Sequence, residues 1–160
     1  RFLPVVQPTT REDWQTWLDD ALDRSRAGLE LAYATVRVAD RTIIGSTRYL
    51  ALRPEHRSLE IGWTWLSPDA WGSGANTEAK LLQLEHAFEE LGCRRVEFKT
   101  DAQNDRARAA LAGLPAAFEG IHRQHMLVRH GENRDSAWYS ILDSEWPGVR
   151  AALHRRIGRS

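Results

Sequence analysis

Residues 59–92 show the clearest alternation of apolar and polar side chains in the chain, and the predicted fold is centred on them. The first residues of this stretch alternate as in a strand with one buried face. The apolar face carries Leu59, Ile61, Trp63 and Trp65. The opposite face carries Glu60, Gly62 and Thr64. Pro68 ends the strand.

A turn that contains Gly72 and Gly74 connects this strand to a helix. The helix begins near Asn76 or Thr77, either of which can cap it, and Gly92 is a suitable stop. Its buried stripe repeats every three or four residues, at Leu81, Leu84, Phe88 and Leu91. A strand, a glycine turn and a helix in this order expose backbone N–H groups at the positive end of the helix, which suits a phosphate or diphosphate. The turn by itself fits a purely geometric role equally well.

The segments on either side predict a mixed sheet flanked by helices. Thr9 and Glu12 have the spacing of a capping box, and a helical stripe follows them. The strand at 95–100 should run parallel to the Glu60 strand, because a helix connects the two. The other strands should pair antiparallel through short turns. The helices and strands predicted outside residues 59–92 are 10–26, 29–38, 42–52, 95–100, 101–113 (a loop leading into a helix), 117–128, 136–142 and 144–157.

Composition narrows the class of protein. A length of 160 residues suits one domain with a core, and 42 % apolar with 28 % charged residues is typical of a globular protein. The net charge is zero, so no global field attracts nucleic acid or an anionic membrane. A single cysteine fits a reducing compartment. No apolar run approaches the roughly 20 residues of a membrane span, and no signal peptide is visible. We therefore expect a cytoplasmic enzyme.

No metal site is expected. His122 and His125 are three residues apart on a predicted strand, so they should face opposite sides of the sheet. No other group of histidine, cysteine and carboxylate side chains has the spacing of metal ligands.

The central stretch as a whole is more specific than its turn, and it resembles motif A of the GNAT acetyltransferases. That motif is a diphosphate-binding turn, [Q/R]-x-x-G-x-[G/A], preceded by a strand that bears a carboxylate. The matching segment here is Trp71-Gly72-Ser73-Gly74-Ala75-Asn76, and the carboxylate is Glu60. The segments EIGWTWL, KTDAQNDRARAAL and DSAWYSILDSEWP extend the likeness over nearly the whole chain, and they are most similar to the RimJ/RimL type.

This resemblance implies an α+β fold of the GNAT kind. Its sheet is mostly antiparallel and mixed, with a splayed central pair of parallel strands, and helices flank it. Residues 1–160 would form a single domain that lacks the family's first strand and first helix. The co-substrate would be acetyl-CoA, with no metal. The partners would be an amine acceptor and a second copy in a homodimer, with no nucleic acid and no membrane.

The resemblance also implies which residues bind the cofactor. Backbone N–H groups of the turn would bind the diphosphate, a backbone N–H near Trp65 or Leu66 would stabilise the oxyanion, and Asn104 would bind the pantetheine arm. Arg106 and Arg108 would reach the 3′-phosphate. The turn residues in this set are Gly72, Ser73, Gly74, Ala75, Asn76 and Thr77.

Glu60 is the expected general base, and Tyr139 is a candidate proton donor. The alternatives are an ion-paired surface glutamate and a core tyrosine. Ala107 stands where RimJ/RimL-type enzymes often carry a serine that protonates the leaving thiolate, so the general acid is unassigned. Trp71 and Asn76 also depart from motif A, although their backbone amides remain.

Three functions follow from these residues. The first is an N-acetyltransferase that uses acetyl-CoA and a primary amine, with a protein N-terminal α-amine as one acceptor. The second is the same chemistry on a small amine such as an aminoglycoside, a polyamine or an amino acid. The third is a CoA-binding protein with little catalysis.

Overall fold

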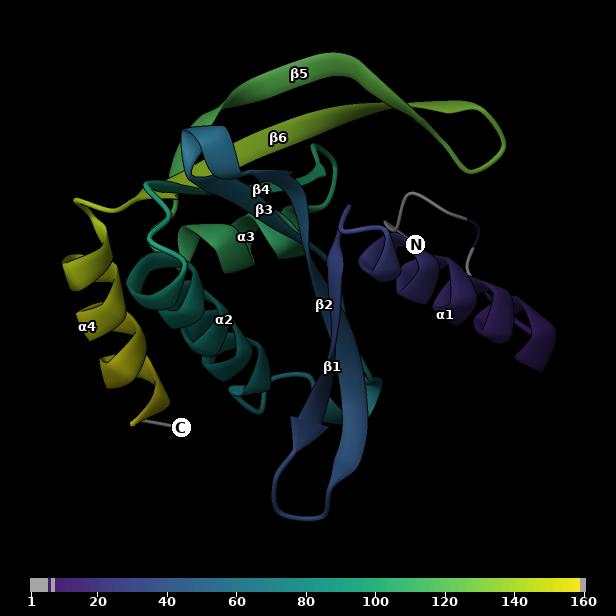
Figure 1. Ribbon diagram of the computed structural model, residues 1–160, viewed down its shortest axis with the longest axis horizontal. Coiled ribbons are helices and arrows are strands. Elements are labelled where there is room, and N and C mark those ends of the chain that lie inside the picture. The colour runs from purple at the N-terminus through teal and green to yellow at the C-terminus, as the bar shows by residue number, and fades with distance from the viewer. Residues whose placement is uncertain (1–5, 7, 159–160) are drawn as a thin grey trace.

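The computed structural model describes residues 6 and 8–158. The prediction that the chain opens on a segment that would follow a first strand and helix concerns residues 1–10, of which 1–5 and 7 lie outside the described residues. Figure 1 shows the helices and strands in chain order. They are α1 (Arg11–Arg26), β1 (Leu31–Arg37), β2 (Thr42–Arg53), β3 (Ser58–Leu66), α2 (Ala75–Glu85), β4 (Arg95–Asp101), α3 (Asp105–Ala112), β5 (Ala117–Val128), β6 (Glu132–Leu142) and α4 (Trp146–Ile157).

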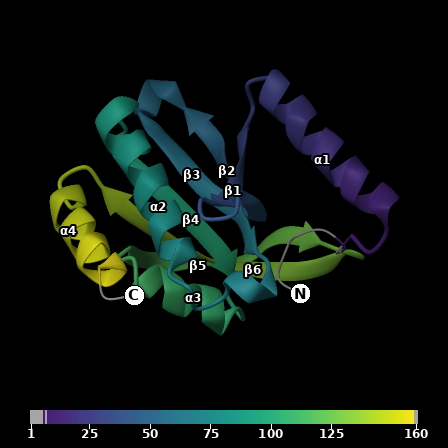
Figure 2. The same ribbon diagram turned by 90° about the horizontal axis from the view of Figure 1, so that it is seen from below.

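The strands form one six-stranded mixed sheet in the order β1-β2-β3-β4-β6-β5. Among the described strands, only the central pair, β3 and β4, runs parallel, and its connection passes through α2. The predicted mixed α+β fold is therefore confirmed. In Figure 2, α2 and α4 lie on one side of the sheet and α1 lies on the other.

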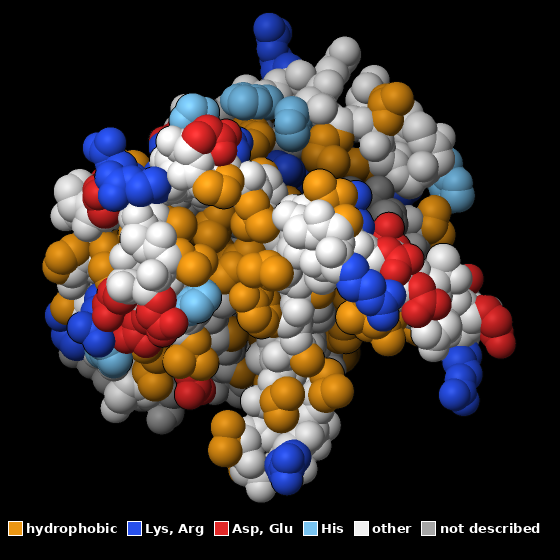
Figure 3. Space-filling model, in the orientation of Figure 1, with side chains coloured by type: hydrophobic (Ala, Val, Ile, Leu, Met, Phe, Trp, Pro, Cys, Tyr) orange, Lys and Arg blue, Asp and Glu red, His pale blue; other side chains and the backbone are white. Residues whose placement is uncertain are grey.

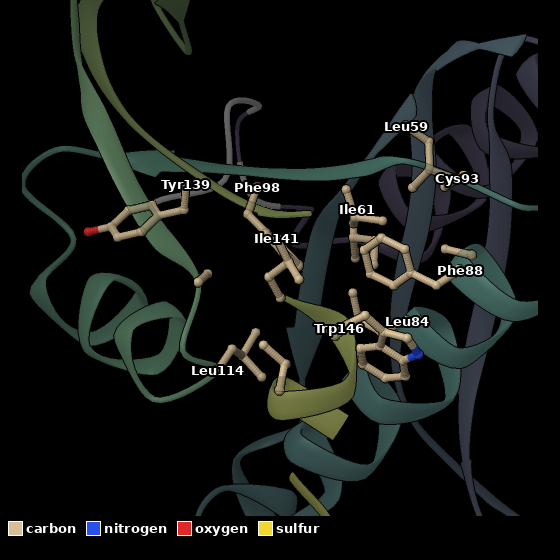
Figure 4. Packing of buried hydrophobic residues seen from close by; sticks show 14 of the residues in the cluster. Leu59, Ile61, Leu84, Phe88, Cys93, Phe98, Leu114, Tyr139, Ile141 and Trp146 are labelled. Atoms are coloured by element: carbon tan, nitrogen blue, oxygen red, sulfur yellow. The ribbon is translucent and has the colours of Figure 1, made fainter. Parts of the chain in front are cut away.

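The hydrophobic core fills the space between the sheet and the α2/α4 side. Ile61 of β3, Leu84 of α2 and Val96 of β4 are almost fully buried in it. The ring of Phe88 stacks on that of Trp146 with centroids 5.3 Å apart, which joins the turn that follows α2, at 86–90, to α4 (Figure 4). Each such side chain contributes roughly 1.5–3 kcal/mol by leaving water. The core thus fixes β3, β4 and α2 relative to one another.

The parallel pair is joined over only part of its length. Residues pair between the strands at Ser58↔Arg95, Leu59↔Val96 and Glu60↔Glu97, and the pairing of these two described strands stops at Glu60. From that point β3 and β4 diverge, as predicted for a splayed pair. The gap opens toward the loop that leads into α2.

A β-bulge reverses the faces of β3 halfway along the strand. Its pairing with β2 shifts between Arg48↔Gly62 and Ser46↔Trp65, and Trp63 takes a left-handed backbone conformation with φ 50°. One extra residue in a strand moves every later side chain to the other face. Thr64 therefore points to the α2 face, whereas Trp65 points to α1, where it meets Trp14. The predicted single alternation from Leu59 to Trp65 is wrong after Gly62.

The starts of two helices also differ from prediction. The capping box of α1 uses Thr10 and Asp13 instead of Thr9 and Glu12. Helix α2 begins at Ala75 with Gly74 as its N-cap, so neither Asn76 nor Thr77 caps it. The end of α2 continues into a π-helical turn over His86–Glu90 before Gly92.

The last hairpin is longer than predicted, because its turn lies at 129–131 and β6 begins at Glu132. The β1–β2 hairpin extends away from the core, and apolar side chains are visible on its surface in Figure 3. Exposed apolar residues there include Val36, Val38 and Ile43. Within the described residues, no helix combines the length and apolar character that crossing a membrane requires.

Candidate active site

A cavity of about 1090 Å³ occupies the gap between β3 and β4 and extends to both faces of the sheet. The loop between β3 and α2 lines one end of it, and the buried carboxylate of Glu60 lines another part. The cavity also receives side chains from α1, α2, α3 and the β5–β6 hairpin. The polar lining residues that matter most below are Glu60, Thr64, Lys80, Lys99, Asn104 and Arg106.

The turn before α2 has the geometry of an anion-binding site. Gly72 and Gly74 have φ of 77° and 83°, a conformation that favours glycine. Gly74 is the N-cap of α2 and provides no side-chain cap, and the Ser73 hydroxyl accepts a hydrogen bond from the first helix amide, that of Ala75, at 3.4 Å. The Ser73 hydroxyl donates to the Ala70 carbonyl at 2.7 Å, which holds the turn in place. The positive end of α2 therefore faces the cavity.

The predicted turn residues do not all reach the cavity. Four of them line it, namely Gly72, Gly74, Asn76 and Thr77. Ser73 and Ala75 lie in the turn but are not among the lining residues.

Trp71 and Arg106 stand beside this turn. The Trp71 indole donates to the Leu66 carbonyl at 3.0 Å, and the Arg106 guanidinium lies 4.0 Å above the Trp71 ring. Arg106 lines the cavity and brings a positive charge to the phosphate end. Arg108 points elsewhere: its side chain donates to the Tyr139 hydroxyl at 3.2 Å and to the Ala102 carbonyl at 3.3 Å. The Arg108 side chain therefore bonds within the protein and does not line the cavity.

Asn104 caps α3 and also lines the cavity. Its side-chain oxygen accepts a hydrogen bond from the Ala107 backbone N–H at 3.1 Å. The two interpretations of this residue, a helix cap and a wall of the binding site, are therefore compatible. Ala107, one turn further, lines the same wall with a methyl group.

Glu60 is almost fully buried, with 1 % of its surface exposed, and it points to the face opposite α2. Its carboxylate accepts a hydrogen bond from Lys99 Nζ at 2.8 Å. Burial raises the pKa of Glu60 above its usual value, and the neighbouring Lys99 ammonium opposes that shift. A carboxylate of raised pKa that lines a cavity has the properties of a general base. Glu60 is not a surface glutamate.

Gly62 leaves the space that the Glu60 carboxylate occupies. A Cβ on Gly62 would lie 3.2 Å from Glu60 Oε1 and 3.1 Å from the Leu50 side chain. The glycine therefore allows close approach at the point where β3 leaves β4.

Tyr139 lies in the hydrophobic core, away from the cavity lining. It is buried, its ring packs on Phe118 with centroids 5.2 Å apart, and its hydroxyl accepts a hydrogen bond from Arg108. Trp65 and Leu66 both line the cavity, and a backbone N–H that stabilises an oxyanion would have to lie at such a position. The geometry favours Glu60 over Tyr139 as the group that meets a substrate.

Lys80 of α2 is the functional candidate that sequence reasoning missed. It lines the cavity and is 4 % exposed, and its ammonium donates to Thr64, Gln83 and Thr47. All three acceptors are neutral oxygens, and burial lowers the pKa of Lys80 to about 7. A signal was present, since Lys80 and Lys99 are the only lysines among 22 lysine and arginine residues.

The two histidines of β5 are on the same side of the sheet, and the prediction that they face opposite sides is wrong. The pairing of β5 with β6 shifts between His122 and Met126, which turns the strand at Gln124. The His122 and His125 rings lie 5.6 Å apart, and both contact the Trp138 ring. In the described part of the chain, no three His, Cys, Asp or Glu side chains gather as metal ligands do.

Comparison with known families and structures gives a consistent result. The family model described as "Acetyltransferase (GNAT) domain" matches residues 1–114. No curated protein matches the chain. Among solved structures, a GCN5-related N-acetyltransferase from Brucella melitensis is 36% identical with a TM-score of 0.89, over 96% of this chain and 68% of that one.

Two further structures extend this comparison. A protein from T. thermophilus is 39% identical with a TM-score of 0.89, over 98% of this chain and 81% of that one. A ribosomal-protein-S5-alanine acetyltransferase from Vibrio fischeri is 19% identical with a TM-score of 0.70, over 89% of this chain and 80% of that one. The last likeness concerns the fold alone.

Proposed function

Because this chain belongs to the GNAT acetyltransferase family, we propose that it is an N-acetyltransferase that moves an acetyl group from acetyl-CoA to a primary amine. One observation supports this more than any other. A single cavity joins an uncapped, glycine-containing helix start to a buried carboxylate, through a gap between two strands. We treat residues 1–160 as one domain of this activity.

The cofactor residues fit acetyl-CoA. The diphosphate would bind the amides of the turn at Gly72–Thr77, with Arg106 close enough to add a positive charge. Asn104 would contact the pantetheine arm as it enters the gap between β3 and β4. A backbone N–H of Trp65 or Leu66 would donate to the thioester oxygen as it gains negative charge. Acetyl-CoA supplies the activated acetyl group.

The acceptor would approach Glu60 from the α1 face. Asp20, Arg24 and Glu30 line the cavity on that side. Glu30 is paired with Arg24 and Arg48, so the exposed Asp20 is the carboxylate there that favours a cationic acceptor. Glu60 would take a proton from the ammonium, either directly or through a water molecule. The free amine then attacks the thioester carbon.

A protein N-terminal α-amine suits this base. Deprotonation of an α-amine with pKa 7.7–8.0 costs about 1 kcal/mol at pH 7, whereas a lysine at 10.4 costs about 4.6 kcal/mol. A single buried carboxylate therefore suffices for the α-amine. Small amines such as polyamines, aminoglycosides or amino acids are the alternative acceptors, and the test separates the two classes.

The test measures release of free CoA thiol across a panel of N-terminal peptides and small primary amines. We expect at least one amine to accelerate release, and Glu60→Gln to lower kcat/KM by about 10²–10⁴-fold. Because the raised pKa of Glu60 means that the carboxylate ionises at a higher pH, activity should fall on the acid side above the usual range of a glutamate.

The controls separate an enzyme from a binding protein. Calorimetric titration of acetyl-CoA should give the same affinity for the wild type and Glu60→Gln. Glu97→Gln is the matched control. Glu97 lies opposite Glu60 in the pairing of β3 with β4, and its carboxylate forms an ion pair with Arg95. It should keep its activity. If acetyl-CoA binds but no amine in the panel releases thiol, the chain is a CoA-binding protein and the enzymatic proposal is wrong.

A further inference from the structure

A buried amine and two hydroxyls form a cluster on the α2 face, directly behind the bulge of β3. Lys80 Nζ donates to Thr64 Oγ1 at 2.8 Å, to Gln83 Oε1 at 2.9 Å and to Thr47 Oγ1 at 3.2 Å. The two threonine hydroxyls are 2.8 Å apart. Lys80 and Thr64 line the cavity, so this hydrogen-bonded chain opens into the space between β3 and β4.

The groups that pack around the amine carry no opposite charge. The titratable neighbour on β2 is Tyr49, whose hydroxyl donates to the Gln83 carbonyl at 2.6 Å and whose pKa is raised by burial. The His86 ring stacks on Tyr49 at 6.1 Å. On the other face of the cavity, Glu60 and Lys99 pair with each other. Burial therefore acts on Lys80 unopposed and lowers its pKa to about 7.

The choice of lysine at this position is informative. The chain has 22 lysine and arginine residues, of which only Lys80 and Lys99 are lysines, and both line this cavity. Arginine serves as the cation everywhere else. A guanidinium does not release its proton in a protein, whereas a buried ammonium does. Both side chains of the protein that carry an ε-amine able to release a proton therefore line this cavity.

We propose that Lys80 and Thr64 form a proton relay that protonates the sulfur of the departing CoA from the α2 face, while Glu60 acts on the amine from the opposite face. This inference rests on the proposed acetyl transfer. The gap between β3 and β4 gives a thioester access to both faces at once, because the strands stop pairing at Glu60. Thr64 follows Glu60 on the same strand, between the carboxylate and the phosphate turn.

The step balances as follows. The acceptor nitrogen attacks the thioester carbon and forms the C–N bond. The proton that this nitrogen then loses to become an amide passes to the Glu60 carboxylate, which has released the proton of the ammonium to solvent. The C–S bond then breaks, and its electron pair goes to the sulfur. The Thr64 hydroxyl gives its proton to the sulfur and takes one from Lys80 Nζ, so that CoA leaves as a thiol. Lys80 is left as a neutral amine and regains a proton from solvent after the product has gone.

The low pKa of Lys80 makes this transfer favourable. A thiol has a pKa near 8.5, so an ammonium of pKa about 7 gives its proton to the thiolate with an equilibrium constant of roughly 30. A lysine at the usual 10.4 would oppose the same transfer by roughly 80-fold. The relay also takes the role left open at Ala107, whose methyl group has no proton to give.

The direct test is NMR of the full chain labelled with ¹³C at lysine, because only two side chains then give signals. The pH titration of each ε-carbon is followed with CoA bound and with desulfo-CoA bound, which lacks the sulfur. We expect the Lys80 signal to show a second step near pH 8.5, where the bound sulfur ionises, in the CoA complex and not in the desulfo-CoA complex, because the two groups titrate as a coupled pair. The Lys99 signal should not distinguish the two ligands.

Variants show whether the hydroxyl carries the coupling. Thr64→Val keeps the shape of the side chain and should remove the difference between CoA and desulfo-CoA. Thr47→Val is the matched control and should keep it, because the bond from Lys80 to Thr64 remains. With the best amine of the panel, Thr64→Val should also lower kcat by about 100-fold, whereas Thr47→Val should not.

The outcomes separate the two proposals. If neither CoA nor acetyl-CoA binds, the proposed function is wrong and the relay fails with it. If CoA binds but Lys80 gives the same titration curve in both complexes, the relay alone is overturned. The same holds if Lys99 senses the sulfur instead, or if Thr64→Val is as active as the wild type.

Discussion

Glu60 and Lys80 are two buried ionisable side chains whose pKa values move in opposite directions for the same reason. Burial disfavours the charged form of each, so the pKa of the carboxyl is raised and that of the amine is lowered. Both values move toward neutrality, where proton transfer to and from a substrate is most efficient. Burial therefore explains why one cavity holds both a candidate base, Glu60, and a candidate acid, Lys80.

Lys80 should make the free energy of unfolding depend on pH. Its pKa of about 7 in the folded chain lies below the ordinary 10.5, so the unfolded chain binds more protons between these values and stability rises with pH in that window. The slope is about 1.4 kcal/mol per pH unit, and the cost of burial is fully present below pH 7. Lys80→Met removes this cost, so the variant should be more stable at neutral pH, by about 5 kcal/mol at most.

Denaturant titrations from pH 6 to 9.5 measure this difference between the variant and the wild type. The difference matters more than the absolute values, because Cys93 also has a pKa raised by burial and adds its own pH dependence to both proteins. Arg26→Met serves as a control and should keep the slope, since Arg26 is an exposed cation of α1 and Lys80 is unchanged. A Lys80→Met variant that follows the wild-type slope throughout would mean that the amine is charged in the folded state.

The sequence allows one of these two site residues to be recognised, Glu60, and not the other, Lys80. Glu60 could be chosen because it matches the carboxylate that precedes the turn in motif A and shares a predicted strand face with Gly62 and Thr64. Lys80 could not be chosen by its spacing, because one lysine on a helix is normally a solvated residue. Its burial depends on Thr47 and Thr64, which come from two strands far away in the sequence.

At the element scale, most strands and helices follow from periodicity because each has one face in the core. The bulge in β3 does not, since Trp63-Thr64-Trp65 continues the same alternation of apolar and polar letters. What holds the bulge is tertiary: the Arg48 guanidinium lies 4.7 Å from the Trp63 ring centroid, and Thr64 bonds to Lys80. The same limit applies to the shift in β5 that brings His122 beside His125.

Helix α1 is attached to the sheet by a buried ion pair. Arg48 of β2 donates to Glu30 at 2.9 Å, and both side chains are almost fully buried. Glu30 also accepts from Arg24 of α1 at 2.8 Å, and the Trp17 ring of the same helix covers the Arg48 guanidinium at 4.9 Å. This contact places α1 over the proposed acceptor side of the cavity.

Glu30→Ala should therefore destabilise the fold by about 3–5 kcal/mol, because it leaves the Arg48 charge buried without its partner. Asp23→Ala in α1 is the matched control, because its exposed pair with Arg26 contributes about 0–1 kcal/mol. Denaturant unfolding gives both values. Equal effects of the two substitutions would show that the Glu30–Arg48 pair does not attach α1.

At the scale of the whole molecule, the parallel pair could be predicted because a helix connects the Glu60 strand to the next strand, whereas the order of strands is implied by the resemblance to the GNAT family. The cavity could not, since its walls come from α1, α2, α3, the central strands and the β5–β6 hairpin. The sequence also does not show that Glu60 lies on one face of the sheet while Thr64 and Lys80 lie on the other. That division appears only when the bulge in β3 and the end of the β3–β4 pairing are seen together.

The most direct test of the central claim is a crystal structure of the chain with acetyl-CoA bound. The account predicts that the diphosphate lies on the backbone amides of residues 72–77, and that the pantetheine arm passes between β3 and β4. The thioester should end between the Glu60 carboxylate on one face and the Thr64 hydroxyl on the other. A diphosphate bound elsewhere, or a thioester outside the gap between these two strands, would contradict it.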